Sequence, residues 1–199
     1  MIVGVTGSFG SGKSTVSDFL RQRGAVVLDA DKTAHQCLQV GHSCYDRIAQ
    51  LFGSSKMGED HQIDRRRLGK VVFSNVKKLK RLTQVIHPCV RQKFKEETQK
   101  ILERDLEMMI VFDVPLLFES GMDREVDVIV VATTTLKKQT ERAIQCFGLT
   151  EQEVLRRIHA QLSLQEKAMR ADFVVSTSGS LDETKDQVEK LCQQLQLLR

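Results

Sequence analysis

The sequence predicts an α/β fold built on a doubly wound, five-stranded parallel sheet, and three observations lead to it. Short apolar runs rich in β-branched residues alternate along the chain with longer segments of helical periodicity. The runs are almost continuously apolar, as expected for parallel strands that are buried on both faces. A glycine-rich turn joins the first run to the first helical segment. Strands that alternate with helices in this way are typical of a sheet covered by helices on both faces.

Five strands and five long helices are expected along the chain. The strand candidates are Ile2–Thr6, Ala25–Asp29, Met108–Asp113, Val126–Ala132 and Asp172–Ser176. The helix candidates are Lys13–Arg23, His87–Arg104, Leu136–Cys146, Glu151–Gln161 and Leu181–Leu197.

The connection between the second and third strands is longer than the others. No convincing strand lies between Asp31 and Glu107. Three further helical patterns fill this stretch, at Cys44–Phe52, Arg65–Phe73 and Lys77–Ile86. A long helical insert on a parallel sheet is a candidate lobe for a second substrate. A second helical excursion, from Leu136 to Met169, separates the last two strands.

Composition and charge exclude several classes of protein. A length of 199 residues suits one domain with sub-lobes, and 41% apolar with 28% charged residues argues against a disordered chain. The net charge of +4 is too small, and the basic residues too scattered, for a DNA-binding protein. Aromatic residues make up 5%, without Trp, which argues against stacking on single-stranded nucleic acid. No stretch approaches the roughly 18 apolar residues of a membrane span.

The cysteines and the first residues both favour a cytoplasmic protein. The five cysteines are Cys37, Cys44, Cys89, Cys146 and Cys192. Their number is odd and no C-x-x-C pair occurs, so we expect free thiols rather than a disulfide framework or a zinc site. Residues 1–7 contain no basic segment, and their apolar run is too short for a signal peptide.

The most specific motif is the segment Gly7–Thr15, which reads GSFGSGKST and matches the phosphate-binding pattern G-x-x-x-x-G-K-[ST]. A chance glycine-rich turn is the alternative, but the segment follows a predicted strand and opens a predicted helix. Its glycines let successive backbone N–H groups point at phosphate oxygens, beside the positive end of that helix. The residues expected to bind ATP are Gly10, Ser11, Gly12, Lys13, Ser14 and Thr15.

Within this loop, Lys13 is expected to reach the β- and γ-phosphates and the Ser14 hydroxyl to ligate Mg²⁺. The motif by itself does not separate kinases from GTPases, ATPase motors or nucleotide sensors. The chain has no guanine-reading N-K-x-D motif and no L-S-G-G-Q-like signature. These absences favour a kinase.

Carboxylates follow two of the predicted strands, at the edge where parallel sheets bind ligands. We favour Asp31, in the segment Asp29-Ala30-Asp31, as the group that orients an acceptor hydroxyl and takes its proton, with Asp29 turned partly toward the sheet. The alternative is that either Asp caps the next helix. Asp113 is placed to touch Mg²⁺ directly or through water. Its alternative role is pairing with a core lysine or a backbone amide.

In order along the chain, several segments together resemble the dephospho-CoA kinase family. They are Thr6-Gly7 with the loop through Thr15, Asp29-Ala30-Asp31, Ile86-His87-Pro88, Pro115-Leu116-Leu117-Phe118-Glu119, Gln139 to Arg142, Arg157 to Gln161, Lys167 and Ala171-Asp172-Phe173-Val174-Val175. The resemblance extends from Val3 to about Val188. The ordered set is specific, although each segment other than the loop is common.

The resemblance implies ATP-dependent phosphorylation of the ribose 3′-hydroxyl of 3′-dephospho-CoA, with Asp31 as the acceptor's base. It implies a P-loop kinase fold with a helical substrate-binding insert and a helical lid. On this view the core comprises residues 1–31, 105–134 and 171–199, the acceptor-binding insert is 32–104 and the lid region is 135–170. Arg142 is then expected to reach from the lid toward the phosphates as a catalytic cation, beside Lys13.

The chain departs from the family at three positions. The family often has an Arg and an Asp where this chain has Cys146 and Phe147, which puts a lid cation in doubt. It often has an Asn near the adenine where this chain has Thr177, which puts an adenine contact in doubt. Four basic residues could replace the missing cation: Lys137, Lys138, Arg156 and Arg157.

Two further residues have both a functional and a structural interpretation. His87 precedes Pro88, which suits the first turn of a helix, so His87 either caps that helix or, as the resemblance suggests, contacts the acceptor. Arg65 belongs to a basic run that is either a solvated face or a binding site for the pyrophosphate of a CoA-type acceptor.

Three functional hypotheses follow. The first is a kinase that uses ATP and dephospho-CoA, as a monomer or weak homo-oligomer without nucleic-acid or membrane partners. The second is another small P-loop kinase of the shikimate or gluconate type, since a D-x-D after the second strand also occurs there. The third is a nucleotide-binding sensor with impaired turnover, a possibility that Cys146 keeps open.

Overall fold

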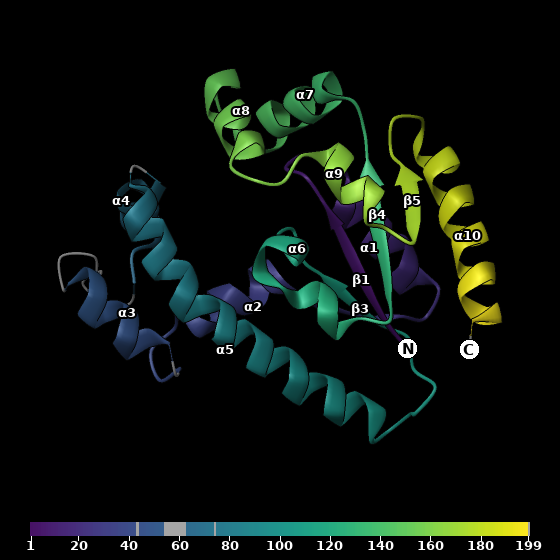
Figure 1. The fold of residues 1–199 in the computed structure, drawn as a ribbon, viewed down its shortest axis with the longest axis horizontal. Helices are drawn as coiled ribbons and strands as arrows, with labels where there is room; N and C mark the ends of the chain where they lie inside the picture. The colour runs from purple at the N-terminus through teal and green to yellow at the C-terminus, as the bar shows by residue number, and fades with distance from the viewer. Residues whose placement is uncertain (43, 54–62, 74, 199) are drawn as a thin grey trace. The chain divides into compact units, whose positions relative to one another are not determined.

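A computed structural model of the chain describes residues 1–42, 44–53, 63–73 and 75–198 (Figure 1). The chain forms two compact units. One, here called the sheet unit, comprises Met1–Asp29 and Ile101–Arg199. The other, the helical unit, comprises Ala30–Lys100.

The sheet unit contains a five-stranded sheet in the order β2-β3-β1-β4-β5, with all neighbours parallel. The strands are β1 Ile2–Gly7, β2 Val26–Asp29, β3 Ile110–Asp113, β4 Val128–Thr133 and β5 Phe173–Ser176. The predicted five-stranded parallel sheet is therefore confirmed. In the register, Asp113 lies opposite Val5 of β1 and Asp29 of β2. The two carboxylates consequently share one edge of the sheet with the loop that follows β1.

Burial on both faces explains the apolar character of the central strands. Val3, Val5, Val111 and Val130 have no exposed surface. One core cluster joins these strands to apolar residues of the first and last helices, including Leu20. β-Branched residues suit such positions because their stiff side chains pack well on a pleated surface.

A helix follows every strand of the sheet. The helix that follows β2 belongs to the helical unit, and the others belong to the sheet unit. They are α1 Lys13–Gln22, α6 Leu117–Ser120, the 3₁₀ helix η2 Met122–Glu125, α7 Leu136–Phe147, α8 Glu151–His159, α9 Leu164–Met169 and α10 Leu181–Leu197. Helices α1 and α10 pack against each other, and α10 also packs on β5. Helices α7 and α8 contact each other beyond the carboxyl end of β4 (Figure 1).

Capping explains where three of these helices begin. Thr150 with Glu153, Ser163 with Glu166, and Ser180 with Glu183 form reciprocal capping boxes at the starts of α8, α9 and α10. The expected range of α10 is confirmed, whereas α8 ends at His159, two residues before the expected Gln161. Helix α9 was not predicted as a separate element. Its S-x-x-E signature at Ser163 is the signal that locates it.

The helical unit contains α2 Ala30–Cys37, α3 Tyr45–Phe52, α4 Arg65–Phe73 and most of α5 Val76–Leu102. No β-strand occurs among the described residues of this unit, in agreement with the sequence-based expectation. A second apolar cluster, which includes Cys37, Cys44, Tyr45, Ile48 and Val85, forms its core.

The two helices expected at Lys77–Ile86 and His87–Arg104 form one 27-residue helix, α5, with Pro88 in its interior. The prediction that Pro88 starts a helix is therefore wrong, and so is the interpretation of His87 as its cap. A proline removes one backbone hydrogen bond and strains the preceding turn. Val85, Val90 and Phe94 are buried on either side of it, and tertiary packing of this kind stabilises a helix beyond its local propensity.

The expectation of five free thiols is wrong for two cysteines. Cys44 and Cys89 form a disulfide between the start of α3 and the middle of α5, with a Cα–Cα distance of 6.6 Å. Cys37, Cys146 and Cys192 are free. The partners are 45 residues apart, and the apolar cluster of the helical unit brings them together. No spacing rule in the sequence indicates such a pairing.

Among the described helices, none combines the length and the apolar composition that crossing a membrane requires.

Breaking the Cys44–Cys89 bond should destabilise the helical unit. Closing a loop of this length restricts the unfolded chain, so Cys89→Ala should lower the free energy of unfolding by about 2–4 kcal/mol. Thermal unfolding with and without dithiothreitol measures the effect, and the free, exposed Cys146→Ser serves as the control. Titration of the unreduced, denatured protein should find three thiols. Five titratable thiols, with unfolding midpoints unaffected by reductant, would contradict the assignment.

Candidate active site

The phosphate-binding motif forms the loop between β1 and α1, as predicted. Gly10 and Gly12 have φ angles of 76° and 81°, in the left-handed region that favours glycine. A Cβ atom on Gly10 would lie 2.5 Å from the carbonyl oxygen of Gln139 on α7. A Cβ atom on Gly12 would lie 2.8 Å from the hydroxyl of Thr177. Both glycines are therefore required by the backbone and by close packing against neighbouring segments.

The Lys13 ammonium forms an ion pair with the Asp113 carboxylate. The Lys13 side chain is 14% exposed and that of Asp113 is 6% exposed, so little water screens the pair. The sequence left two roles open for Asp113, contact with Mg²⁺ or pairing with a lysine or a backbone amide. In the structure it pairs with a lysine. Because the lysine belongs to the phosphate loop, the pair also joins the end of β3 to that loop.

Two residues at this edge offer the oxygen ligands that Mg²⁺ prefers. Ser14 is exposed in the first turn of α1, and Asp113 ends β3. Protein sites for Mg²⁺ usually supply one or two carboxylates, with phosphate oxygens and water completing the octahedron. The described residues contain no group of three or more His, Cys, Asp or Glu side chains arranged to hold a metal. The donors present fit a metal that arrives with its nucleotide.

Arg142 on α7 is linked to the phosphate loop through Thr177. Its two terminal nitrogens donate to the Thr177 hydroxyl and carbonyl oxygens at 2.9 and 2.7 Å. The same hydroxyl donates to the carbonyl oxygen of Ser11 in the loop, at 2.8 Å. Thr177 is 3% exposed, so these bonds form away from water. Thr177 is therefore a bridge between α7 and the loop.

Lys167 on α9 is fully buried and holds three segments together. Its ammonium donates to the carbonyl oxygens of Pro115 at 2.7 Å and Gly7 at 3.3 Å. It also pairs with Glu119 at 3.0 Å, and Glu119 accepts a hydrogen bond from the amide of Leu162. Burial lowers the pKa of Lys167, and the hydrogen bond and charge of Glu119 oppose that shift. The start of the phosphate loop is thus fixed by a lysine 160 residues away.

Sequence reasoning gave no site role to Lys167, although a signal was present. Leu164, Lys167 and Ala168 stand at positions i, i+3 and i+4 of one helix, so the lysine occupies a place in an apolar stripe. A buried charge at such a position requires a partner of opposite charge, and Lys167 has one in Glu119.

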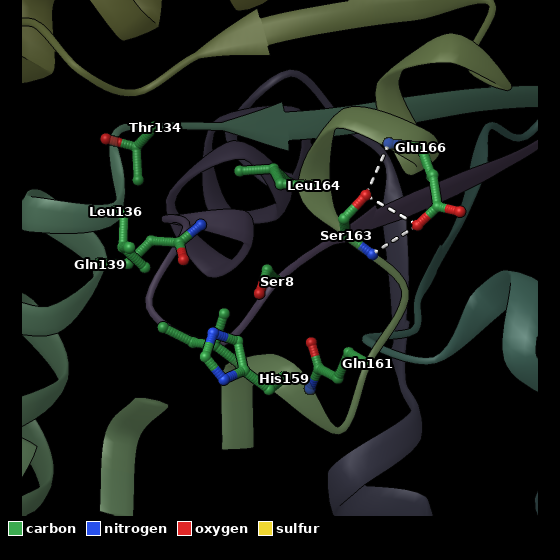
Figure 2. A pocket seen from close by; sticks show the side chains of 10 residues that line it. Ser8, Thr134, Leu136, Gln139, His159, Gln161, Ser163, Leu164 and Glu166 are labelled. Carbon is green, nitrogen blue, oxygen red and sulfur yellow. Dashed lines mark hydrogen bonds between the residues drawn. The ribbon is translucent and has the colours of Figure 1, made fainter. Parts of the chain in front are cut away.

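A cavity of about 400 Å³ lies beside the phosphate loop. Figure 2 shows Ser8, His159 and Gln161 around it, with the Ser163–Glu166 hydrogen bonds at its edge. The Ser8 hydroxyl and the side-chain amide oxygen of Gln161 are buried without a hydrogen-bond partner in the described part of the chain. Unsatisfied polar atoms of this kind are usually met by water or by a ligand.

The predicted acceptor-binding residues belong to the helical unit. Asp31 is exposed in the first turn of α2, directly after Asp29 and Ala30. His87 is half-buried within α5, and burial, followed by the charge of Arg91, lowers the pKa of its imidazole. The neutral imidazole is therefore favoured near pH 7. Arg65 opens α4, but its side chain lies outside the described part of the structure.

The parallel sheet, the glycine-rich loop with its lysine and the acidic end of β3 define the class of protein: a P-loop protein of the nucleotide-binding type. Solved shikimate kinases share this fold, as shown by the enzyme from Bacteroides thetaiotaomicron, with a TM-score of 0.53 at 15% identity over 98% of both chains. At that identity the likeness concerns the fold alone.

The chain belongs to the dephospho-CoA kinase family, whose sequence model matches residues 1–183. The dephospho-CoA kinase of Bacillus licheniformis is 40% identical over 191 residues, which cover 96% of this chain and 94% of that protein. The dephospho-CoA kinase of Carboxydothermus hydrogenoformans is 39% identical over 96% of this chain and 93% of that protein. A solved Thermus thermophilus protein is similar at a TM-score of 0.82 and 33% identity, covering 98% and 97%. The solved dephospho-CoA kinase of Campylobacter jejuni is similar at a TM-score of 0.71 and 29% identity, and the match covers 98% of this chain and 96% of that one.

Removing the Lys167 charge should destabilise the sheet unit. Lys167→Met leaves Glu119 without its cation and removes the ammonium donor from the carbonyl oxygens of Gly7 and Pro115, and breaking a buried pair typically costs about 3–5 kcal/mol. Urea unfolding of this variant should be compared with that of Lys185→Met, which removes an exposed lysine from α10 and should shift stability by less than about 0.5 kcal/mol. The double variant Lys167→Met/Glu119→Gln should recover part of the loss. A loss for Lys167→Met no greater than that of the control would show that Lys167 is not an anchor.

Proposed function

We propose that this protein transfers the γ-phosphoryl group of ATP to the ribose 3′-hydroxyl of 3′-dephospho-CoA, giving CoA and ADP, the last step of coenzyme A biosynthesis. Membership of the dephospho-CoA kinase family along residues 1–183, with an intact phosphate loop, carries the proposal. We further propose a cytoplasmic location.

The phosphate loop binds the triphosphate. The backbone N–H groups from Gly10 to Thr15 and the positive end of α1 attract the phosphate oxygens. Lys13 binds the β- and γ-phosphates and stabilises the charge that develops there. Ser14 and Asp113 would hold Mg²⁺. When bound, Mg²⁺ would offset the negative charge of the phosphates.

The helical insert, residues 32–104, binds the acceptor. Asp31 orients the 3′-hydroxyl and accepts its proton as the phosphoryl group is transferred. Its solvent exposure beside the carboxyl end of β2 supports this role, because an exposed carboxylate is free to meet a substrate. His87, held neutral, and Arg65 contact the acceptor, the latter at its pyrophosphate.

Residues 135–170 act as a lid over ATP, and Arg142 is its cation at the phosphates. The hydrogen bonds of Arg142 to Thr177, which is itself bonded to the loop at Ser11, support a position beside the nucleotide. A guanidinium can hold a phosphoryl group with two parallel hydrogen bonds, as Arg142 holds the two oxygens of Thr177.

The identity of the acceptor can be tested by measuring ADP release with several candidate hydroxyl compounds. ADP release should require dephospho-CoA and should not be stimulated by shikimate, gluconate or AMP. Lys13→Ala, which removes a cation from the developing charge, should lower turnover by about 10² to 10³ at saturating ATP and so control for contaminating ATPases. Equal rates with AMP would contradict the proposed acceptor. Tight ATP binding without turnover on any acceptor would support the sensor hypothesis.

The base is tested by paired substitutions at the end of β2. Asp31→Asn keeps the shape but loses basicity, so turnover should fall by about 10² or more while ATP affinity is nearly unchanged. Asp29→Asn is the matched control, two residues away, and should be milder. Measured kcat values in the reverse order would assign the base to Asp29.

A further inference from the structure

The Cys44–Cys89 disulfide links the start of α3 to α5 within the helical unit. Its two sulfurs differ in their surroundings. Cys44 has no exposed surface, whereas Cys89, in the middle of α5, is partly exposed. Thiol–disulfide exchange requires a thiolate to reach one of the two sulfurs directly. The sulfur of Cys89 is therefore the accessible point of attack on this bond.

Cys44 is suited to leave when the Cys89 sulfur is attacked. It is the N-cap residue of α3, whose first residue is Tyr45. The positive end of a helix stabilises a thiolate, and a more stable thiolate leaves faster. The Cys44 sulfur also lies 3.4 Å from the carbonyl oxygen of Val85. Once the sulfur has taken a proton, that oxygen can accept its hydrogen bond, so the reduced side chain has a polar partner inside the core.

A third cysteine of the same apolar cluster leaves the bond in place. Cys37 is 3% exposed and belongs to the cluster that contains Cys44. Burial raises the pKa of the Cys37 thiol, and the charge of Lys93 and a backbone hydrogen bond oppose that shift. Because only a thiolate attacks a disulfide, a protonated Cys37 does not exchange with its neighbours. The helical unit therefore has two defined covalent states, with the Cys44–Cys89 bond closed or open.

The state of this bond bears on the acceptor. The unit Ala30–Lys100 is small for an independently stable domain, and units of this kind commonly need a cross-link. His87, an expected acceptor contact, precedes Cys89 by two residues on α5. In the cytoplasm, where we place this protein, disulfides are usually transient and are either catalytic or redox-sensing. That location favours a regulatory bond over a purely structural one.

We propose that the Cys44–Cys89 bond is a redox switch, which a dithiol reductant opens by attack at Cys89, so that α3 is released from α5 and acceptor binding weakens. One thiolate of the dithiol bonds to the Cys89 sulfur, and Cys44 leaves as a thiolate. The second thiolate of the dithiol then displaces Cys89 and closes the reductant's own disulfide. Two electrons pass to the protein, and Cys44 and Cys89 take the two protons that the dithiol loses. The proposal rests on the proposed kinase function.

The expected effect is confined to the acceptor. A cross-link that holds a binding site in its bound form raises affinity by lowering the cost of ordering that site. Reduction should therefore raise the KM for the acceptor about tenfold. The phosphate loop belongs to the other unit, so kcat at saturating acceptor and the Kd for ATP should change by less than about twofold.

The test compares the oxidised full chain with the same chain reduced by dithiothreitol, without denaturant, in the ADP-release assay. Both arms use S-methyl dephospho-CoA, so that the thiol of the acceptor cannot open the bond. Reoxidation with glutathione disulfide should restore the native KM. The double variant Cys44→Ser/Cys89→Ser should have the raised KM with and without dithiothreitol. Cys146→Ser, which removes a free, exposed thiol, is the matched control and should respond to dithiothreitol as the native chain does.

Three results of this assay would overturn the proposal. The first is a KM that reduction leaves unchanged, and the second is a response to dithiothreitol that persists in the double variant. The third is a Kd for ATP that rises together with the KM, because the effect would then not be specific to the acceptor.

Two further measurements require no turnover and so separate failure of this proposal from failure of the proposed function. Amide hydrogen exchange in α3 should accelerate on reduction, while exchange in β1 should not. Brief treatment of the native protein with glutathione, a monothiol, should leave a mixed disulfide on Cys89, located by peptide mass mapping. A bond that opens only in denaturant, a mixed disulfide on Cys44, or equal exchange in both states would overturn the switch. If neither state releases ADP with dephospho-CoA, the kinase function fails and these two measurements alone decide the switch.

Discussion

The buried ammonium of Lys167 is the interaction on which the phosphate-binding edge of the sheet unit depends. It holds the carbonyl oxygen of Gly7, where the phosphate loop begins, and that of Pro115, two residues beyond Asp113. Desolvating an ammonium is costly, so the position is tolerable only because two carbonyl oxygens and the Glu119 carboxylate surround it. A shift of any partner would expose an unsatisfied charge. The loop and the acidic end of β3 are therefore held in one arrangement by electrostatics and not by apolar packing alone.

The other end of the phosphate loop is held from the opposite direction. Thr177, just beyond β5, bonds to Ser11 and receives Arg142 from α7. The backbone of α7 also comes so close to Gly10 that no side chain could fit there. The loop is thus bounded by α9 near its start and by α7 and β5 near its end. Its backbone N–H groups are consequently preorganised, which is what binding a phosphate with little reorganisation requires.

The contacts that α7 makes with the loop gather at this same boundary. Thr177 links Arg142 of α7 to the loop. Phe147, the last residue of α7, stacks on Phe9 of the loop, and Cys146 beside it is a free, exposed thiol. The loop is therefore held from α7 by a polar bridge and by a ring contact.

Much of this protein could be predicted from its sequence because the signals are local. Buried parallel strands are apolar and β-branched, and the phosphate loop depends on glycines that adopt left-handed angles at Gly10 and Gly12. Both features are properties of a few consecutive residues. The acids at the strand ends, Asp29 and Asp113, were located for the same reason, since the carboxyl ends of parallel strands share one edge.

What only the tertiary structure decided are contacts between residues far apart in the chain. Lys167 reaches Gly7, Arg142 reaches Thr177, and Cys44 pairs with Cys89, and no local pattern specifies any of these partners. Helix α5 continues through Pro88 because buried neighbours on both sides stabilise it against a local preference to break. The sequence by itself determined the fold, the phosphate loop and the family, because these follow from short-range stereochemistry and order along the chain. How the phosphate loop is held could be learned only from the tertiary structure. The energy of a buried charge or of a stacked ring depends on partners that are far away in the sequence and are brought close by folding.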